Sequence, residues 1–398
     1  MPPTPLRVLI APDKFKGTLT ATDAAAAIAS GWRKARPTDQ LVPWPISDGG
    51  EGFGSLLGEA LHARPRTVRT VDAAGQPLRA VWWWDAKTRT AIIESARVIG
   101  LALLPRGQFH PFNLDTRGLA AVFAAANKIG ARRCIVGIGG SATNDGGFGV
   151  AQSLGWQFLD ARGAAIERWT ELHRLARVIP PKQQLFREFV VAVDVQNPLL
   201  GAHGCSRVYG PQKGLRPEDL PHAERCLRRL ARVLKSQQGQ DAARLPGAGA
   251  AGGLGFGLHQ FAGATLRPGF DLFAKTTNLL EALLDCDVVV TGEGAMDRQT
   301  VMGKGVGELA RMAAKHGRPC LALAGRIEDA QQLRPHFAHQ HALTELGTVA
   351  QAQKHAASWL EKLAAVLAAE ITEGSALTST RATSPRRGAA RPRRTRRS

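Results

Sequence analysis

Short apolar runs alternate with helical segments near both ends of the chain. Residues 6–11 are almost continuously apolar, as in a strand of a parallel sheet that is covered on both faces. An alanine-rich helix follows to about Lys34, and Thr20 or Thr22 is placed to cap its start. Residues 41–46 form the next strand. This alternation predicts a doubly wound α/β domain with a parallel sheet.

The pattern changes between residues 66 and 94. Three short runs, 67–71, 78–84 and 90–94, are separated by tight turns and are typical of an antiparallel meander. Three adjacent tryptophans, residues 82–84, lie in the second run, and we expect them to pack in the core and at its edge. The change of pattern predicts a second domain.

Strand and helix alternate again after the meander. The expected elements are a helix over 116–129 and strands over 133–138, 189–193, 288–291, 320–324 and 341–346. The simplest architecture is one α/β domain built from both chain ends, with a second domain inserted between about residues 66 and 283.

Composition narrows the class of protein. The chain has 398 residues, 44% of them hydrophobic and 21% charged, which is typical of a globular protein with room for two domains. We expect no membrane span, because no run approaches about 18 apolar residues, and the N-terminus does not have the pattern of a signal peptide.

Cysteine and histidine spacing gives no metal motif. The five cysteines are far apart and lack CxxC spacing, which favours reduced thiols in the cytoplasm over a disulfide framework or a zinc site. The 11 histidines show neither HxxxH nor HExxH spacing, so none is assigned to a metal.

Much of the net charge of +19 comes from the C-terminus. Eight arginines and no acidic residue lie between residues 381 and 398. The segment 374–398 is predicted to be a disordered basic tail, because its composition cannot form a core. Such a tail could bind polyanions, but a solvated extension is the favoured interpretation, and we expect no specific nucleic-acid partner.

Polar residues follow the predicted parallel strands at five places. These candidate residues are Asp13, Lys14 and Lys16; Asp48 and Glu51; Ser141, Thr143, Asn144 and Asp145; Asp194 and Asn197; and Glu293, Asp297, Thr300 and Lys304. Ligands of open parallel sheets bind outside the carboxyl ends of the strands. A helix cap or turn would explain one such loop, but it is a poor explanation for five.

These residue types suit phosphoryl transfer, which needs cations on phosphate oxygens and a group that aligns or deprotonates the attacking hydroxyl. Four lysines are candidate partners of phosphate or carboxylate groups: Lys14, Lys16, Lys213 and Lys304. Lys213 and Lys304 are the stronger candidates, since each lies in a glycine turn. Three acids are candidate Mg²⁺ ligands or general bases: Asp194, Glu293 and Asp297.

Two glycine patterns leave a dehydrogenase as an alternative. Residues 247–252 fit GxGxxG but do not follow a strand, whereas residues 137–142 fit GxGxxA and do follow one. A Walker A loop is absent from the sequence, so a kinase here must bind phosphate in another way.

The order of these loops resembles that of bacterial glycerate kinases of the two-domain type. The matching blocks are APDKFKGTLTA (11–21), SDGGEGF (47–53), IESARVIGL (93–101), IGGSATNDGG (138–147), DVQNPLLG (194–201), YGPQKG (209–214), PGAGAAGGLGFGL (246–258) and TGEGAMDRQTVMGK (291–304). They cover roughly residues 6 to 330.

The resemblance implies ATP-dependent phosphorylation of D-glycerate with Mg²⁺. It favours 2-phosphoglycerate as the product, with the 3-phosphate as the alternative. It also implies a flavodoxin-like domain over 1–66 and 284–373, an inserted α/β domain over 67–283, and an active site in the cleft between them. The chain could also form a homo-oligomer.

The resemblance also suggests roles for the candidate residues. Glycines of 139–147 and 247–257, including Gly139, Gly140, Gly249, Gly252 and Gly253, would bind ATP phosphates together with Lys213 or Lys304. Asp194 and Asp297 would hold Mg²⁺. Asp13 or Glu293 would orient the glycerate hydroxyl, and Lys14, Lys16 or Arg298 would bind its carboxylate. The remaining polar candidates would complete the binding site.

Two segments depart from the family pattern. Residues 114–121 lack two hydroxyls and a glycine that the family usually has, and residues 305–307 shorten a turn that usually contains proline. The first change leaves open a catalytically idle descendant that acts as a regulator.

Overall fold

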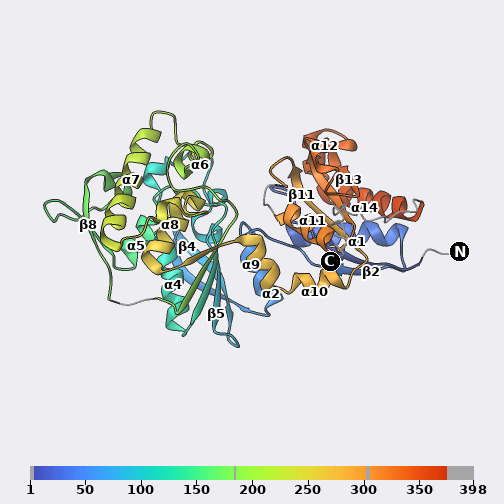
Figure 1. Ribbon diagram of the computed structural model, residues 1–398, viewed down its shortest axis with the longest axis horizontal. Helices are drawn as coiled ribbons and strands as arrows, with labels where there is room; N and C mark the ends of the chain where they lie inside the picture. Colours follow the sequence, from blue (N-terminus) through green and yellow to red (C-terminus); the bar gives the residue numbers. More distant parts are fainter. Residues whose placement is uncertain (1–3, 183–184, 302–304, 374–398) are drawn as a thin grey trace, which may run out of the picture.

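The computed structural model describes residues 4–182, 185–301 and 305–373, which form two sheets with helices packed around each (Figure 1). The first sheet contains β1 (Arg7–Ile10), β2 (Gln40–Pro43), β11 (Val288–Met296), β12 (Cys320–Ile327) and β13 (His339–Ala342). All its strands are parallel, in the order β13-β12-β11-β1-β2. Counted along the chain this order is 2-1-3-4-5, the flavodoxin-like order. The predicted sheet built from both chain ends is therefore confirmed.

Alternate residues of β1 face two different cores, as expected for a parallel sheet that is covered on both faces. Val8 and Ile10 pack with α1 (Ala21–Ala35) and α14 (Ala356–Glu373), whereas Leu9 packs on the side of α11 (Gly305–Lys315). Thr20 caps α1, because its hydroxyl accepts a hydrogen bond from the Asp23 N–H at 3.1 Å.

The predicted strand over 341–346 was placed too late in the chain. The strand β13 ends at Ala342, and a 3₁₀ turn, η5 (Leu343–Glu345), follows it. The carboxylate of Glu345 accepts a hydrogen bond from the Ala342 N–H at 2.7 Å. That side-chain cap stabilises the turn, and the apolar residues 342 and 343 alone do not reveal it.

The second sheet has the order β10-β9-β6-β5-β4-β3. Its strands are β3 (Arg64–Val71), β4 (Pro77–Asp85), β5 (Thr90–Glu94), β6 (Arg133–Gly137), β9 (Glu188–Val193) and β10 (Thr265–Pro268). The first three pair antiparallel, which confirms the meander, and β5, β6, β9 and β10 pair in parallel. A separate hairpin joins β7 (Gln157–Asp160) and β8 (Leu175–Ile179).

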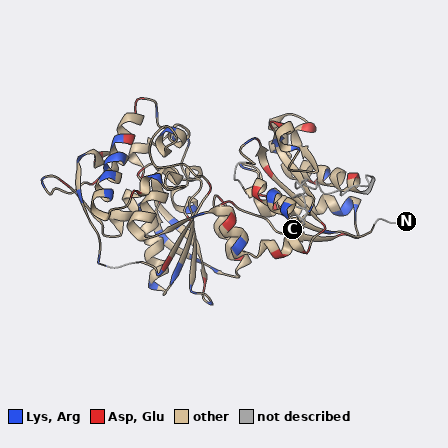
Figure 2. Ribbon diagram, viewed as in Figure 1, with Lys and Arg blue, Asp and Glu red and all other residues tan. Residues whose placement is uncertain are grey.

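The remaining helices connect these strands. They are α2 (Phe53–Ala60), α3 (Ala96–Ile99), α4 (Gly118–Lys128), α5 (Phe148–Ser153), α6 (Cys205–Lys213), α7 (Leu220–Gln238), α8 (Ala250–Ala262), α9 (Gly269–Thr276), α10 (Leu279–Leu284), α12 (Ala330–Leu333) and α13 (Val349–Lys354). Within the described ranges, no helix is both long and apolar enough to cross a membrane. Lys and Arg residues recur along the ribbon of α7 (Figure 2).

Helices α2 and α9 lie between the two sheets (Figure 1). One hydrophobic cluster contains residues of the first sheet, such as Leu9, of both helices, such as Phe53 and Phe273, and of the second sheet, such as Ile135. The two sheets are therefore joined by a continuous apolar core. The domain boundaries at residues 66–67 and 283–284 stay a prediction.

The three adjacent tryptophans are buried, as expected, and they alternate between the faces of the second sheet. Trp82 and Trp84 belong to one core and Trp83 to the other, which includes α2. A Cβ on Gly58 of α2 would lie 2.6 Å from Cδ1 of Trp83. The absence of a side chain at residue 58 therefore lets the helix contact the indole ring directly.

We predict that Gly58→Ala destabilises the protein. The better helix propensity of alanine contributes only about 1 kcal/mol, whereas a clash in a packed core costs about 1–3 kcal/mol. Urea unfolding should show a net loss in the free energy of unfolding. Gly305→Ala is the control, because its new Cβ would have no neighbour closer than 3.6 Å. Equal stability of the two variants would contradict the packing argument.

Candidate active site

A cleft of about 490 Å³ opens between the two sheets. Each of the five predicted strand-end loops contributes to its lining: Asp13, Lys14, Lys16, Asp48, Glu51, Gly140, Asp194 and Glu293. The predicted residues Ser141, Thr143, Asn144, Asp145 and Asn197 are not among the described residues that line it. Strands of two different sheets thus bring their carboxyl ends to one place. The convergence that the sequence suggested is present in the fold.

Backbone contacts hold the loop over 47–52 against the second sheet. The N–H of Gly139 donates a hydrogen bond to the carbonyl of Gly49 at 3.2 Å. A Cβ on Gly139 would lie 2.7 Å from Cα of Gly50 and 3.0 Å from Oδ2 of Asp194. Only glycine permits this approach, so the loops after β2, β6 and β9 meet directly.

The start of α2 is held by a side chain from the second sheet. Glu94, 2% exposed, accepts hydrogen bonds from the N–H groups of Gly52 and Gly54 at 3.0 and 3.1 Å. A carboxylate at a helix N-terminus is favourable because it satisfies donors that have no partner within the helix. Glu94 therefore fixes the loop that carries Asp48 and Glu51. Its position inside the block IESARVIGL was the available signal, although it was not selected from the sequence.

Lys14 lies among carboxylates at the centre of the cleft. Its Nζ is 3.7 Å from Oδ1 of Asp13 and 3.8 Å from Oδ1 of Asp48. Burial acts to lower the pKa of Lys14, but the charges of Asp13, Asp48 and Asp194 outweigh it and raise the pKa above its ordinary value. Lys14 is therefore a permanent cation.

Two of these carboxyls have pKa values near neutrality. Burial raises the pKa of Asp13 to about 7; Lys14 opposes the shift, and Asp48 and Glu293 add to it. Burial and the charge of Asp48 likewise raise the pKa of Asp194 to about 6. Carboxyls that titrate near neutral pH can accept and release a proton during catalysis. The cleft is therefore equipped for general acid–base chemistry.

Lys213, at the end of α6, holds the loop that follows β6. Its Nζ donates hydrogen bonds to Oγ of Ser141 at 3.1 Å and to the carbonyl of Thr143 at 2.7 Å. Burial lowers the pKa of Lys213 to about 8, while nearby groups such as Asp145 and Asp194 act to raise it. This buried ammonium group lies beside the glycine-rich loop, where it could attract a phosphate.

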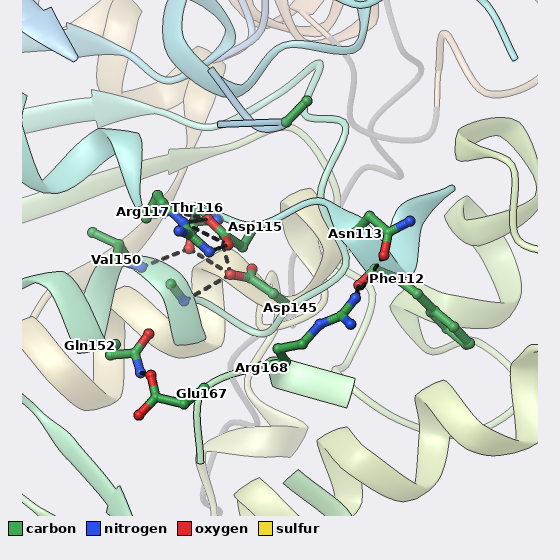
Figure 3. A network of polar contacts seen from close by, with 12 residues as sticks. Phe112, Asn113, Asp115, Thr116, Arg117, Asp145, Val150, Gln152, Glu167 and Arg168 are labelled. Atoms are coloured by element: carbon green, nitrogen blue, oxygen red, sulfur yellow. Dashed lines mark hydrogen bonds and ion pairs between the residues drawn. The ribbon is translucent and has the colours of Figure 1, made fainter. Parts of the chain in front are cut away.

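Asp145 is fully buried and holds two loops together (Figure 3). Its carboxylate accepts hydrogen bonds from N–H and Oγ1 of Thr116 at 3.0 and 2.7 Å, and from the N–H groups of Gly147 and Gly149 at 3.1 and 2.9 Å. Burial raises the pKa of Asp145, and the charge of Asp115 adds to the shift. These contacts suit a positioning role at the start of α5.

Asn144 and Asn197 also contact protein groups. The side-chain amide of Asn144 donates to Oγ of Ser206 at 2.9 Å. The amide of Asn197 donates to the carbonyl of His203 at 2.8 Å, and its oxygen accepts from the Tyr209 hydroxyl at 2.6 Å.

The glycine-rich segment at the start of α8 packs against the same loops. A Cβ on Gly249 would collide with the carbonyl of Pro198, one on Gly252 with the carbonyl of Thr143, and one on Gly253 would lie 2.9 Å from Cα of Gly146. Gly252 and Gly253 also have positive φ, +68° and +87°. This segment therefore packs against the backbone of the loop over 138–147 and supports it.

The segment after β11 folds into a turn of its own. Thr300 donates from Oγ1 to Glu293 at 2.8 Å and accepts from the N–H of Asp297 at 3.1 Å. Oδ1 of Asp297 accepts from the N–H of Gln299 at 2.6 Å. Asp297, Arg298 and Thr300 are not among the described residues that line the cleft. Lys304 lies outside the described residues.

Comparisons with known proteins decide the family. The family model described as the Glycerate kinase family matches residues 8–372. The chain belongs to the glycerate kinase family. It is 38% identical to the glycerate kinase of Halalkalibacterium halodurans, over 80% of this chain and 85% of that one. It is 36% identical to the glycerate 2-kinase of Escherichia coli K12, over 87% and 93%.

A solved structure gives the same result for the fold. It is a crystal structure from Salmonella typhimurium LT2, provisionally described as a glycerate kinase 2. The TM-score is 0.77 and the sequence identity is 33%, and the match covers 93% of this chain and 99% of that one. As a member of the glycerate kinase family, the chain is a phosphotransferase, and the family implies use of ATP.

Sequence reasoning missed several cleft residues of this kinase. Arg326 lines the cleft at the end of β12, where the rule used for the other strands would have found it. Val349 and Gln353 of α13 also line it. They lie in the last third of the chain, where the family motifs are weak and no single residue type marks a site.

We predict that Asp13→Asn stabilises the folded protein at pH 8 more than at pH 5. The pKa of Asp13 rises from 3.8 to about 7 on folding, so the native state holds a proton that the unfolded chain releases. Stability is therefore lost as the pH rises from about 4 to about 7, and Asn removes that loss. The gain should be at least about 1 kcal/mol larger at pH 8.

Urea unfolding at the two pH values measures this difference. Asp160→Asn is the contrast, because hydrogen bonds from the N–H groups of Ala164 and Arg162 lower the pKa of Asp160. That variant should show no gain at pH 8. A gain for Asp13→Asn that is equal at both pH values would refute the prediction.

Proposed function

We propose that this protein transfers the γ-phosphoryl group of ATP to the 2-hydroxyl of D-glycerate, with Mg²⁺, and forms 2-phosphoglycerate. The observation that carries the proposal is the cluster of Asp13, which is buried, with the half-buried Lys14, Asp48 and Asp194 in the cleft. The name of the Escherichia coli relative, glycerate 2-kinase, supports the choice of hydroxyl.

Binding of glycerate requires a cation that is available to its carboxylate. Lys14 is already close to the carboxylates of Asp13 and Asp48, whereas Lys16 is exposed at the mouth of the cleft. We therefore assign the substrate carboxylate to Lys16, with Lys14 holding the surrounding acids in place. Arg298 remains a further candidate. With this division the substrate hydroxyls would face Asp13 and its neighbouring carboxyls.

The attacking hydroxyl must lose its proton as the phosphoryl group arrives. Asp13 is 6% exposed and has a pKa of about 7, so it can accept this proton at neutral pH. Glu293, held by Thr300, would help to orient the same hydroxyl. Lys213 and the N–H groups of the loop over 139–147 would bind phosphate oxygens.

The acidic residues present fit a magnesium ion that is shared with phosphate. Among the described residues, no three of these carboxylates bring oxygens within 4.8 Å of one another, so they do not form a closed cage. Mg²⁺ is usually held by one or two carboxylates plus phosphate and water. Asp194, which lines the cleft, is the first proposed ligand, and Asp297, which lies beyond the lining residues, is the second. When bound, the ion would neutralise charge on the transferred phosphate.

We predict that Asp194→Asn and Lys213→Met each lower kcat strongly. Loss of a charge aimed at the reacting phosphate typically costs about 10²–10³-fold. Initial rates of ADP release measure the effect, and circular dichroism checks the fold. Lys235→Met is the matched control, because that lysine is exposed on α7 and pairs with Asp241 at 2.8 Å. A wild-type kcat in Asp194→Asn or Lys213→Met would remove that residue from the machinery.

We predict a 2-phosphoglycerate signal in ³¹P NMR of the full chain with D-glycerate, ATP and Mg²⁺. The reason is the proposed approach of the 2-hydroxyl, adjacent to the carboxylate, to Asp13. A 3-phosphoglycerate signal would keep the kinase and overturn the regiochemistry. Absence of both products from folded protein would overturn the proposed substrate.

A further inference from the structure

A second group of potential ligands lies outside the cleft. His173 belongs to the 3₁₀ helix η3 (Trp169–Arg174), and His222 and Cys226 belong to α7. One ligand atom of each lies within 4.8 Å of the other two. Across the described part of the chain, this is the one group of three or more His, Cys, Asp or Glu residues that meets this distance.

The spacing within α7 matches that of a metal site. His222 and Cys226 are four residues apart and share one helix face. Nε2 of His222 lies 3.6 Å from Sγ of Cys226. Tetrahedral zinc with Zn–N of about 2.0–2.1 Å and Zn–S of about 2.3 Å requires an N···S separation of about 3.6 Å. Two ligands are therefore already at the required spacing.

The backbone carbonyl of Thr170 lies close to the ligand atoms of both His222 and Cys226. The oxygen of Thr170 lies 2.8 Å from Nε2 of His222 and 3.1 Å from Sγ of Cys226. In the metal-free arrangement the imidazole N–H and the thiol S–H thus point at one acceptor. A cation at this point would replace both hydrogens: the imidazole carries its proton on Nδ1 instead, and the thiol proton leaves to solvent.

We propose that His173, His222 and Cys226 form a zinc site, with the Thr170 carbonyl or a water as the fourth ligand. Imidazole and thiolate ligands favour Zn²⁺ over Mg²⁺, which prefers oxygen. The ion would tie η3 to α7 and stabilise this part of the fold. None of the three residues lines the catalytic cleft, so the site is independent of the proposed kinase reaction.

The cluster can be reached from solvent. His173 is exposed and can move to close the site, and His222 and Thr170 line a second cavity. Burial raises the pKa of Cys226 to about 11, so the ion must displace a bound proton, and the charge of Arg225 on the same helix assists the thiolate.

Cobalt binding provides the test, because a Co²⁺–thiolate bond gives a charge-transfer band that oxygen ligands do not. Metal-free full-length protein is titrated with Co²⁺. We expect the band with one ion per chain, its loss in Cys226→Ser, and at least tenfold weaker binding in His173→Ala. The exposed position of His173 keeps this second variant folded.

Matched controls separate the cluster from other thiols and histidines. Cys286→Ser should keep the band, although that buried thiol also donates to a backbone carbonyl, Leu283, at 3.1 Å. His336→Ala, which removes an exposed histidine elsewhere, should bind as the wild type does. Zn²⁺ should compete with Co²⁺ and raise Tm by about 2–4 °C in wild type and in both controls.

Any of three results would overturn the proposal. They are the absence of a thiolate band in the wild-type protein, a band of unchanged strength in folded Cys226→Ser, and unchanged affinity in His173→Ala. Because the measurements are optical and thermal, they do not depend on turnover of glycerate.

Discussion

The close approach of the loop over 47–52 to the second sheet determines the geometry of the cleft. A Cβ added to Gly49 would lie 3.1 Å from the carbonyl oxygen of Ala192 in β9, and the backbone of Gly139 lies directly against that of Gly50. At the start of α9, a Cβ on Gly269 would collide with the carbonyl of Asp48. Side chains at these positions would push the sheets apart. The meeting of Asp48 with Lys14 and Asp194 depends on these contacts.

The same closeness concentrates like charges. Among the described residues that line the cleft, five carboxylates face three cationic side chains, an excess of two negative charges. Burial first, and then repulsion from Asp48, raise the pKa values of Asp13 and Asp194, and both effects cost stability once the carboxyls ionise. Both proposed substrates are anions, so a divalent cation and the ammonium of Lys213 would offset part of the negative charge when the site is filled.

Sequence patterns predicted the strand ends well, and with them much of the cleft. Apolar runs fix the strand positions, and parallel alternation places their carboxyl ends at one edge, so Asp13, Asp48 and Asp194 could be selected in advance. Contacts between distant segments were not predictable in this way. The bonds from Thr116 to Asp145 span 29 residues, and His173 lies 49 residues before His222. The hydrophobic periodicity along the sequence does not show which distant segments are in contact.

The departure from the family pattern at residues 114–121 can be judged from these contacts. Oγ1 of Thr116 donates to Asp145 and accepts the N–H of Val150 at 3.0 Å (Figure 3). Gly118 lies so close to β3 that a Cβ would collide with the carbonyl of Val71. The hydroxyl and glycine that remain in this segment therefore anchor it to the loop over 138–147 and to the second sheet. Because the support of that loop is intact, the altered segment alone is weak evidence for an idle enzyme, and the cleft residues argue for an active kinase.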